Sequence, residues 1–114
     1  MRYSWCLLPF FLFYSCTYNE IMPIPICESD NPSFYTCVKP IIEQHCLACH
    51  ADASPNGDLS NYDAIRNYMI NGDLLDRIQR IEGSAGFMPL GSNKLDNEQI
   101  QVLINWKNND APNN

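Results

Sequence analysis

Apolar residues recur at helical spacing near the middle of the chain and predict the first helix of a domain. Its apolar face repeats every four residues and comprises Val38, Ile42 and Cys46. Thr36 is expected to cap this helix, which would then begin at Cys37. Pro40 falls within the first turn, where the missing proline N–H does not break the helix.

A second strong pattern lies near the end of the chain. Asp96 is followed three residues later by Gln99, which is the spacing of a capping box, so Asp96 is the expected N-cap of a helix. That helix should end at 108–110, before Pro112. Its apolar stripe comprises Ile100, Val102, Leu103, Ile104 and Trp106.

Two shorter helices are predicted between these. The first starts at Ser60, with Asp63 three residues later, and closes at the pair Asn71 and Gly72. Its buried positions are Ile65 and Met69. Gly83 stops the second helix, whose apolar positions are Leu74, Leu75, Ile78 and Ile81. Because no segment alternates strongly enough to predict a strand, the expected fold class is all-α.

The N-terminal residues have a different pattern. Arg2 is followed by an apolar run at 5–14, which is much shorter than the about 20 residues that span a bilayer. This layout is typical of a secretory signal, and Cys16 after a small residue resembles the acylated cysteine of bacterial lipoproteins. We therefore expect a signal peptide at 1–15, lipid on Cys16, and a proline-containing tether at 16–33. The alternatives are an uncleaved anchor or a signal peptide cut elsewhere, and each arrangement exports the domain.

Composition narrows the classes of function. The chain has 114 residues, of which 46% are hydrophobic, and a formal net charge of −6 from 13 acidic and 7 basic residues. This length is typical of one domain. The acidic balance, without a cluster of lysines or arginines, argues against a nucleic-acid partner.

The motif with the clearest chemistry is Cys-Leu-Ala-Cys-His at 46–50, the C-x-x-C-H pattern of covalent haem c attachment. Positions i, i+3 and i+4 of a helix share one face. Cys46 and Cys49 can therefore form thioethers with one porphyrin while His50 reaches its iron. We expect His50 to donate its second ring N–H to a backbone carbonyl within 51–55.

Two other kinds of site are compatible with a C-x-x-C pair. A zinc site would use both motif cysteines and His50, and Cys27 or Cys37 could complete it. A thioredoxin-like redox pair would follow a strand of a βαβ unit, which the sequence pattern does not contain.

A haem electron carrier commonly places a methionine opposite the histidine. Met88 lies in the glycine-rich stretch 83–91, which predicts a loop able to cover the second face of a haem. Met69 has helical spacing and is expected in the core, and Met22 falls in the tether. Met88 is therefore the expected ligand, and a space-filling loop residue is the alternative.

Taken in order, the motif at 46–50, the pair Met88-Pro89 and a C-terminal helix resemble a class I cytochrome c domain over 34–112. The resemblance implies three to five short helices around one covalent haem, with the N- and C-terminal helices crossing. It also implies electron transfer without substrate turnover. Apolar residues that could exclude water from the haem are Leu59, Tyr62, Phe87, Leu90 and Trp106.

Cys27 and Cys37 are ten residues apart and are not used by the haem motif. In an oxidising compartment we expect them to form a disulfide that joins the tether to the first helix. Two free thiols, or zinc ligation together with the motif, are the alternatives.

These features predict an electron carrier in the periplasm or at the outer membrane, anchored by lipid on Cys16. Its redox partners should carry basic patches, since the chain is acidic. Two other functions remain open at this point. One is a haem-based sensor in which Met88 binds weakly or is displaced, and the other is a zinc-stabilised interaction module without haem.

Overall fold

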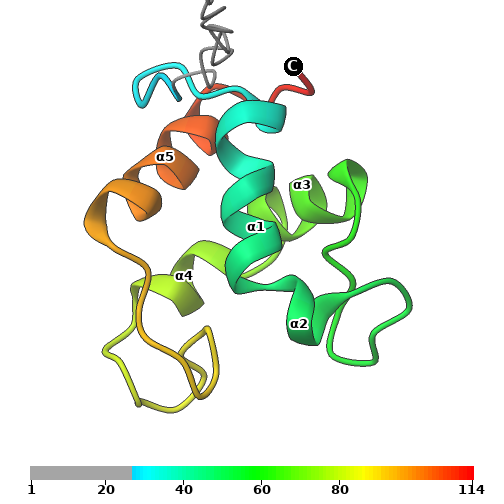
Figure 1. Ribbon diagram of the computed structural model, residues 1–114, viewed down its shortest axis with the longest axis vertical. Helices are drawn as coiled ribbons and strands as arrows, with labels where there is room; N and C mark the ends of the chain where they lie inside the picture. Colours follow the sequence, from blue (N-terminus) through cyan, green and yellow to red (C-terminus); the bar gives the residue numbers. More distant parts are fainter. Residues whose placement is uncertain (1–26) are drawn as a thin grey trace, which may run out of the picture.

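The computed structural model describes residues 27–114. Within this range the chain is helical and has no strand, so the predicted all-α class is confirmed. The helical segments, shown in Figure 1, are η1 (Phe34–Val38), α1 (Lys39–His45), α2 (Leu47–His50), α3 (Tyr62–Ile70), α4 (Leu74–Gln79) and α5 (Asn97–Asn108). The predicted signal peptide, the lipidation site Cys16 and the tether up to residue 26 lie outside the described residues.

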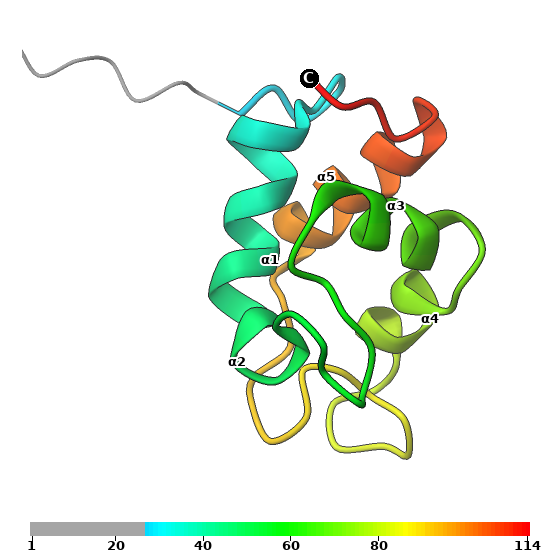
Figure 2. The ribbon, with the colours of Figure 1, turned by 90° about the vertical axis from the view of Figure 1, so that its right-hand side faces the viewer.

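The first helix begins earlier than predicted, because η1 and α1 form one continuous helix (Figure 2). Ser33, not Thr36, is its N-cap, and the Ser33 hydroxyl accepts a hydrogen bond from the Thr36 N–H at 3.5 Å. The early start buries Phe34. The first turns are of the wide π type, and they precede Pro40 near the start of α1. A wider turn accommodates the proline ring, which clashes with the carbonyl four residues earlier in a regular α-helix.

Helix α5 has the start and end that the sequence predicts. The Gln99 N–H donates to the Asp96 carboxylate at 2.7 Å, and the Gln99 side chain accepts from the Asp96 N–H at 3.2 Å. The predicted capping box is therefore confirmed. Helix α5 packs against both η1 and α4.

The middle helices lie where predicted, but two of their bounds differ. Asn61, one residue after the expected Ser60, caps α3 by accepting a hydrogen bond from the Ala64 N–H at 3.0 Å. Helix α4 ends at Gln79, so Ile81 lies outside it and is 81% exposed rather than part of an apolar stripe. Met69 is fully buried in the core, as predicted.

Residues 27–33, which the sequence predicts as the end of the tether, pack against the helices. Cys27 is bridged to Cys37, with Cα atoms 5.1 Å apart, and this is the pairing that the sequence analysis expected. Pro32 is fully buried, and the Asn105 side chain donates to the Ser29 carbonyl at 2.7 Å. These contacts fix the segment against η1 and α5.

Three aromatic residues define one end of the molecule, which we call the aromatic end. The ring centroids of Phe34, Tyr62 and Trp106 lie 5.1, 5.7 and 6.3 Å apart. The last residues fold over them: the Trp106 indole donates to the Pro112 carbonyl at 3.0 Å, and the Tyr62 hydroxyl to the Ala111 carbonyl at 2.8 Å. This end is closed by side chains and backbone together.

The opposite end, which we call the motif end, contains α2, the loop 51–57 and the segment 80–95. Figures 1 and 2 show these parts together at the lower end of the long first helix, away from the C-terminus. Among residues 27–114, no helix combines the length and apolar character needed to cross a bilayer. The fold thus brings the C-x-x-C-H motif and the segment containing Met88 to the same end.

Candidate functional site

The C-x-x-C-H motif lies at the junction of α1 and α2. The carbonyl of Cys46 accepts hydrogen bonds from the N–H groups of Cys49 and His50, at 3.2 and 3.0 Å. This single turn holds the three motif side chains at helical spacing, as a shared porphyrin requires. Cys46 is half-buried, Cys49 is exposed, and both carry free thiols.

Burial raises the pKa of the Cys46 thiol from an ordinary value of 9.0 to about 11. Cys46 is therefore protonated at neutral pH. Burial therefore lowers the reactivity of this thiol as a nucleophile in the haem-free chain. Thioether formation adds the S–H group across a vinyl double bond, which requires a reduced cysteine.

The imidazole of His50 is oriented by a backbone group. Its Nδ1 atom lies 2.9 Å from the carbonyl oxygen of Gly57. Because a carbonyl can only accept a hydrogen bond, Nδ1 is the donor, and in the neutral imidazole the lone pair then lies on Nε2. This is the tautomer that binds a metal ion through Nε2.

The partner of His50 is Gly57, not a residue of 51–55 as predicted. Two successive turns carry the chain further, since the N–H of Ser54 bonds to Ala51 and that of Gly57 to Ser54. Gly57 has a φ of +107°, and a Cβ atom there would lie 2.6 Å from the Tyr68 hydroxyl. Only glycine fits without strain, and a lone glycine in a polar loop is too weak a signal to identify its role from sequence.

Met88 lies in the segment between α4 and α5, at the motif end. Its N–H donates to the Arg77 carbonyl at 3.2 Å, and its side chain is half-buried against the core. Met69, by contrast, is fully enclosed in the core. Of these two methionines, Met88 is the one in a loop at the end where the motif lies.

The five residues predicted to form the haem wall lie in different parts of the structure. Leu59 and Phe87 are buried at the motif end, and the Leu59 N–H bonds to the His50 carbonyl at 2.8 Å. Tyr62 and Trp106 pack with Phe34 at the aromatic end, and Tyr62 also lines a recess that Leu47 and Leu59 share. Leu90 is 80% exposed. Of the five, Leu59, which is bonded to His50, and Phe87, which precedes Met88 in the chain, are the buried residues directly connected to the predicted ligands.

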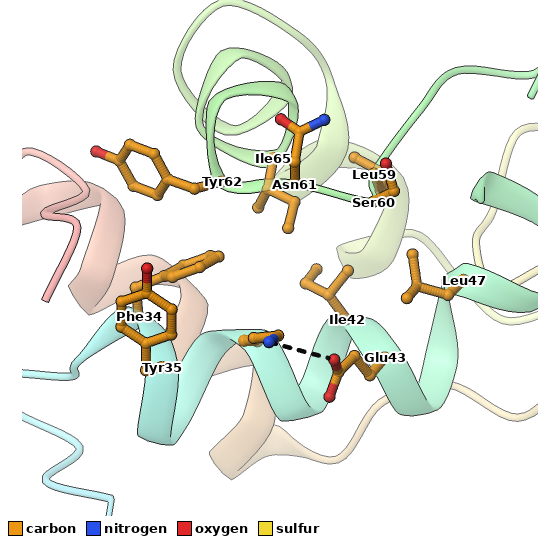
Figure 3. Close-up of a pocket in the computed structure, with 11 residues that line it drawn as sticks. Phe34, Tyr35, Ile42, Glu43, Leu47, Leu59, Ser60, Asn61, Tyr62 and Ile65 are labelled. Atoms are coloured by element: carbon orange, nitrogen blue, oxygen red, sulfur yellow. Dashed lines mark ion pairs between the residues drawn. The ribbon is translucent and has the colours of Figure 1, made fainter. Parts of the chain in front are cut away.

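A recess of about 150 Å³ opens between α1 and the start of α3 (Figure 3). Its apolar lining comprises Phe34, Ile42, Leu47, Leu59, Tyr62 and Ile65. The ion pair of Lys39 and Glu43, 3.7 Å apart, lies beside it. The recess is smaller than the about 300–1,000 Å³ of typical ligand sites, and neither the motif cysteines nor Met88 line it.

The ligand set of the alternative zinc site is not assembled. Within residues 27–114, no group of three or more histidine, cysteine or acidic side chains is arranged to hold a metal ion. Cys27 and Cys37, the cysteines that could complete the set, are joined to each other.

Comparisons with protein families, curated proteins and solved structures found no match for this chain. The fit to a haem is therefore judged on the chain's own residues. Cys46 and Cys49 are reduced and one turn apart, Gly57 leaves the His50 Nε2 free, and Met88 supplies a thioether at the same end. These residue types match those that could hold a c-type haem.

Proposed function

We propose that this chain is an electron carrier with one covalent haem c, bound to Cys46 and Cys49 and ligated axially by His50 and Met88. The hydrogen bond from His50 to Gly57 carries the proposal, because it selects the tautomer that can bind iron. When bound, the haem supplies an iron that cycles between the ferric and ferrous states. In this proposal the fold is that of a class I cytochrome c, with η1–α1 and α5 as its crossing terminal helices.

Each residue at the motif end has a distinct part in this function. Cys46 and Cys49 hold the group covalently, so it is not lost outside the cytoplasm. The Gly57 carbonyl fixes the imidazole of His50 and raises its basicity. The soft thioether of Met88 favours the reduced state, and Leu59 and Phe87 exclude water, which acts in the same direction.

The location that we propose is the periplasm or the outer membrane, with a lipid anchor on Cys16. The leader pattern at 1–16 and the Cys27–Cys37 bridge, which suits an oxidising compartment, support this. We further propose that the redox partners present basic patches to this acidic chain.

Covalent haem tests the proposal directly. The chain is expressed together with haem-ligation machinery, and a denaturing gel of the purified protein is stained for haem. We expect a stained band that is lost in the double variant Cys46→Ala/Cys49→Ala and retained in Cys27→Ser/Cys37→Ser. An unstained wild-type band would overturn the proposal, and a stained but five-coordinate protein would favour the haem-sensor alternative.

A further inference from the structure

The segment that carries Met88 is held against the end of α4 by the side chain of Arg80. The Arg80 Nη1 group donates to the Ala85 carbonyl at 2.9 Å. The Nε and Nη2 groups of the same guanidinium bind the Asp76 carboxylate, one turn earlier on α4. Arg80 thus connects the helix with a carbonyl three residues before Met88.

Gly86 allows this close approach. Its φ is +74°, and a Cβ atom there would collide with Arg80 Nη1. A side chain at this position would displace the guanidinium. The backbone of the loop and the side chain of Arg80 are therefore fitted to each other.

Lys94 connects the other side of the Met88 segment to α4. Its ammonium group donates to the carbonyls of Gln79 and Arg80, each at 2.9 Å. These carbonyls lie at the C-terminal end of α4, where helix geometry leaves them without helical partners. The Lys94 N–H also donates to the Glu82 carboxylate at 2.8 Å.

Met88 lies between these two attachments. Its own N–H bonds to the Arg77 carbonyl on α4, so the loop contacts the helix at the methionine as well. Both basic side chains bind through charge-assisted hydrogen bonds, which are stronger than neutral ones. The loop is consequently fixed to α4 before, at and after Met88.

We propose that Arg80 and Lys94 are positioning residues for Met88. They hold its loop against α4, and thereby keep the thioether at the iron against competing ligands. This inference rests on the proposed function, because it assigns a role toward the haem iron. Neither side chain is proposed to touch the haem or its ligand atoms.

The test uses the haem-loaded ferric protein and imidazole, which competes with the methionine for iron. Loss of the sulfur-to-iron absorption band is followed as imidazole is added. We expect Arg80→Met and Lys94→Met each to bind imidazole about tenfold more tightly, since each loses charge-assisted hydrogen bonds. Lys94→Arg, which retains donors for the helix carbonyls, should stay close to wild type.

Three controls separate positioning from general stability. Arg66→Met and Lys39→Met remove the same charges away from the Met88 loop and should leave imidazole affinity unchanged. Trp106→Phe destabilises the aromatic end and should also leave it unchanged. Hydrogen exchange at the Met88 N–H should accelerate in Arg80→Met and Lys94→Met, and this readout does not depend on the competing ligand.

The two proposals fail in different ways. A wild-type protein without covalent haem or without the sulfur-to-iron band overturns the proposed function, and the positioning role with it. If both are present and the Arg80 and Lys94 variants bind imidazole as wild type does, only the positioning role is wrong. Should Arg80→Met not fold, Arg80→Lys keeps a charge near Asp76 but loses the fork, and it should still bind imidazole more tightly.

Discussion

The Nδ1 atom of His50 lies 2.9 Å from the carbonyl oxygen of Gly57, across the loop 51–56. This contact relates the motif to a position whose backbone only glycine adopts easily, since its φ is +107°. The loop therefore determines the orientation of the imidazole.

Gly57→Ala should lower the yield of covalent, six-coordinate haem protein. The new methyl group would meet the Tyr68 hydroxyl at 2.6 Å and displace the Gly57 carbonyl from His50. Gly83→Ala is the matched control, because Gly83 also has a positive φ, +80°, but has no atom within 4 Å of a new Cβ. Haem content per chain is the measurement. Equal yields from both variants would contradict the role of Gly57.

Replacing each methionine in turn distinguishes the proposed iron ligand, Met88, from the core residue, Met69. Met88→Ala should abolish the sulfur-to-ferric-iron band, with little loss of covalent haem. Met69→Ala should keep the band but destabilise the protein by about 2–5 kcal/mol, because Met69 is fully buried. Absorption spectra and urea unfolding measure the two effects. The ligand assignment is wrong if the band disappears in Met69→Ala and persists in Met88→Ala.

The raised pKa of Cys46 predicts a pH dependence in the haem-free chain. The folded state keeps the thiol protonated up to pH about 11, whereas an ordinary cysteine releases its proton near 9.0. The contribution is thus complete below pH 9 and is lost as the pH rises toward 11, by about 2–3 kcal/mol. Urea unfolding between pH 8 and 11 should show a steeper loss for wild type than for Cys46→Ala. Cys49→Ala, which retains Cys46, should follow wild type.

The Cys27–Cys37 bridge should stabilise the domain without influencing the iron site. It closes a loop of ten residues, which corresponds to about 2–3 kcal/mol in the chain-entropy account. Cys27→Ser/Cys37→Ser should therefore unfold at lower urea concentration, while the sulfur-to-iron band and the reduction potential stay unchanged. A shifted potential would mean that the two ends of the molecule are coupled.

Substitution of Trp106 should affect stability, whereas substitution of Phe87 should affect the reduction potential. Trp106 is fully buried at the aromatic end, so Trp106→Phe should lower stability and leave the reduction potential unchanged. Phe87 is buried next to Met88, so Phe87→Ala should admit water and lower the potential. Protein-film voltammetry and urea unfolding distinguish them. A lowered potential in Trp106→Phe would restore that residue to the haem wall.

Local signals predicted the features that depend on local chemistry. The Asp96–Gln99 capping box uses only residues three apart, and sequence placed it correctly. Periodicity also identified Met69 as buried, but periodicity cannot say what a buried residue contacts. The pattern predicts Tyr62 and Trp106 as haem-wall residues, for example, but does not indicate that they pack with Phe34.

The remaining differences arise from contacts between distant segments. The apolar period continued through Ile81, yet Lys94 binds the carbonyls of Gln79 and Arg80, where α4 ends. The choice of Ser33 over Thr36 as N-cap similarly follows the burial of Phe34 against α5. Such contacts leave no short-range pattern in the sequence.

The position of Cys27 determines the end of the domain at which the described chain begins. The bridge to Cys37 and the bond from Asn105 to Ser29 fix the start of the described chain at the aromatic end. In a lipid-anchored protein, the chain from the anchor would therefore join the domain at the end opposite the C-x-x-C-H motif. Cys49 and Met88 belong to the other end of the domain, the motif end, where a diffusing partner could approach the motif.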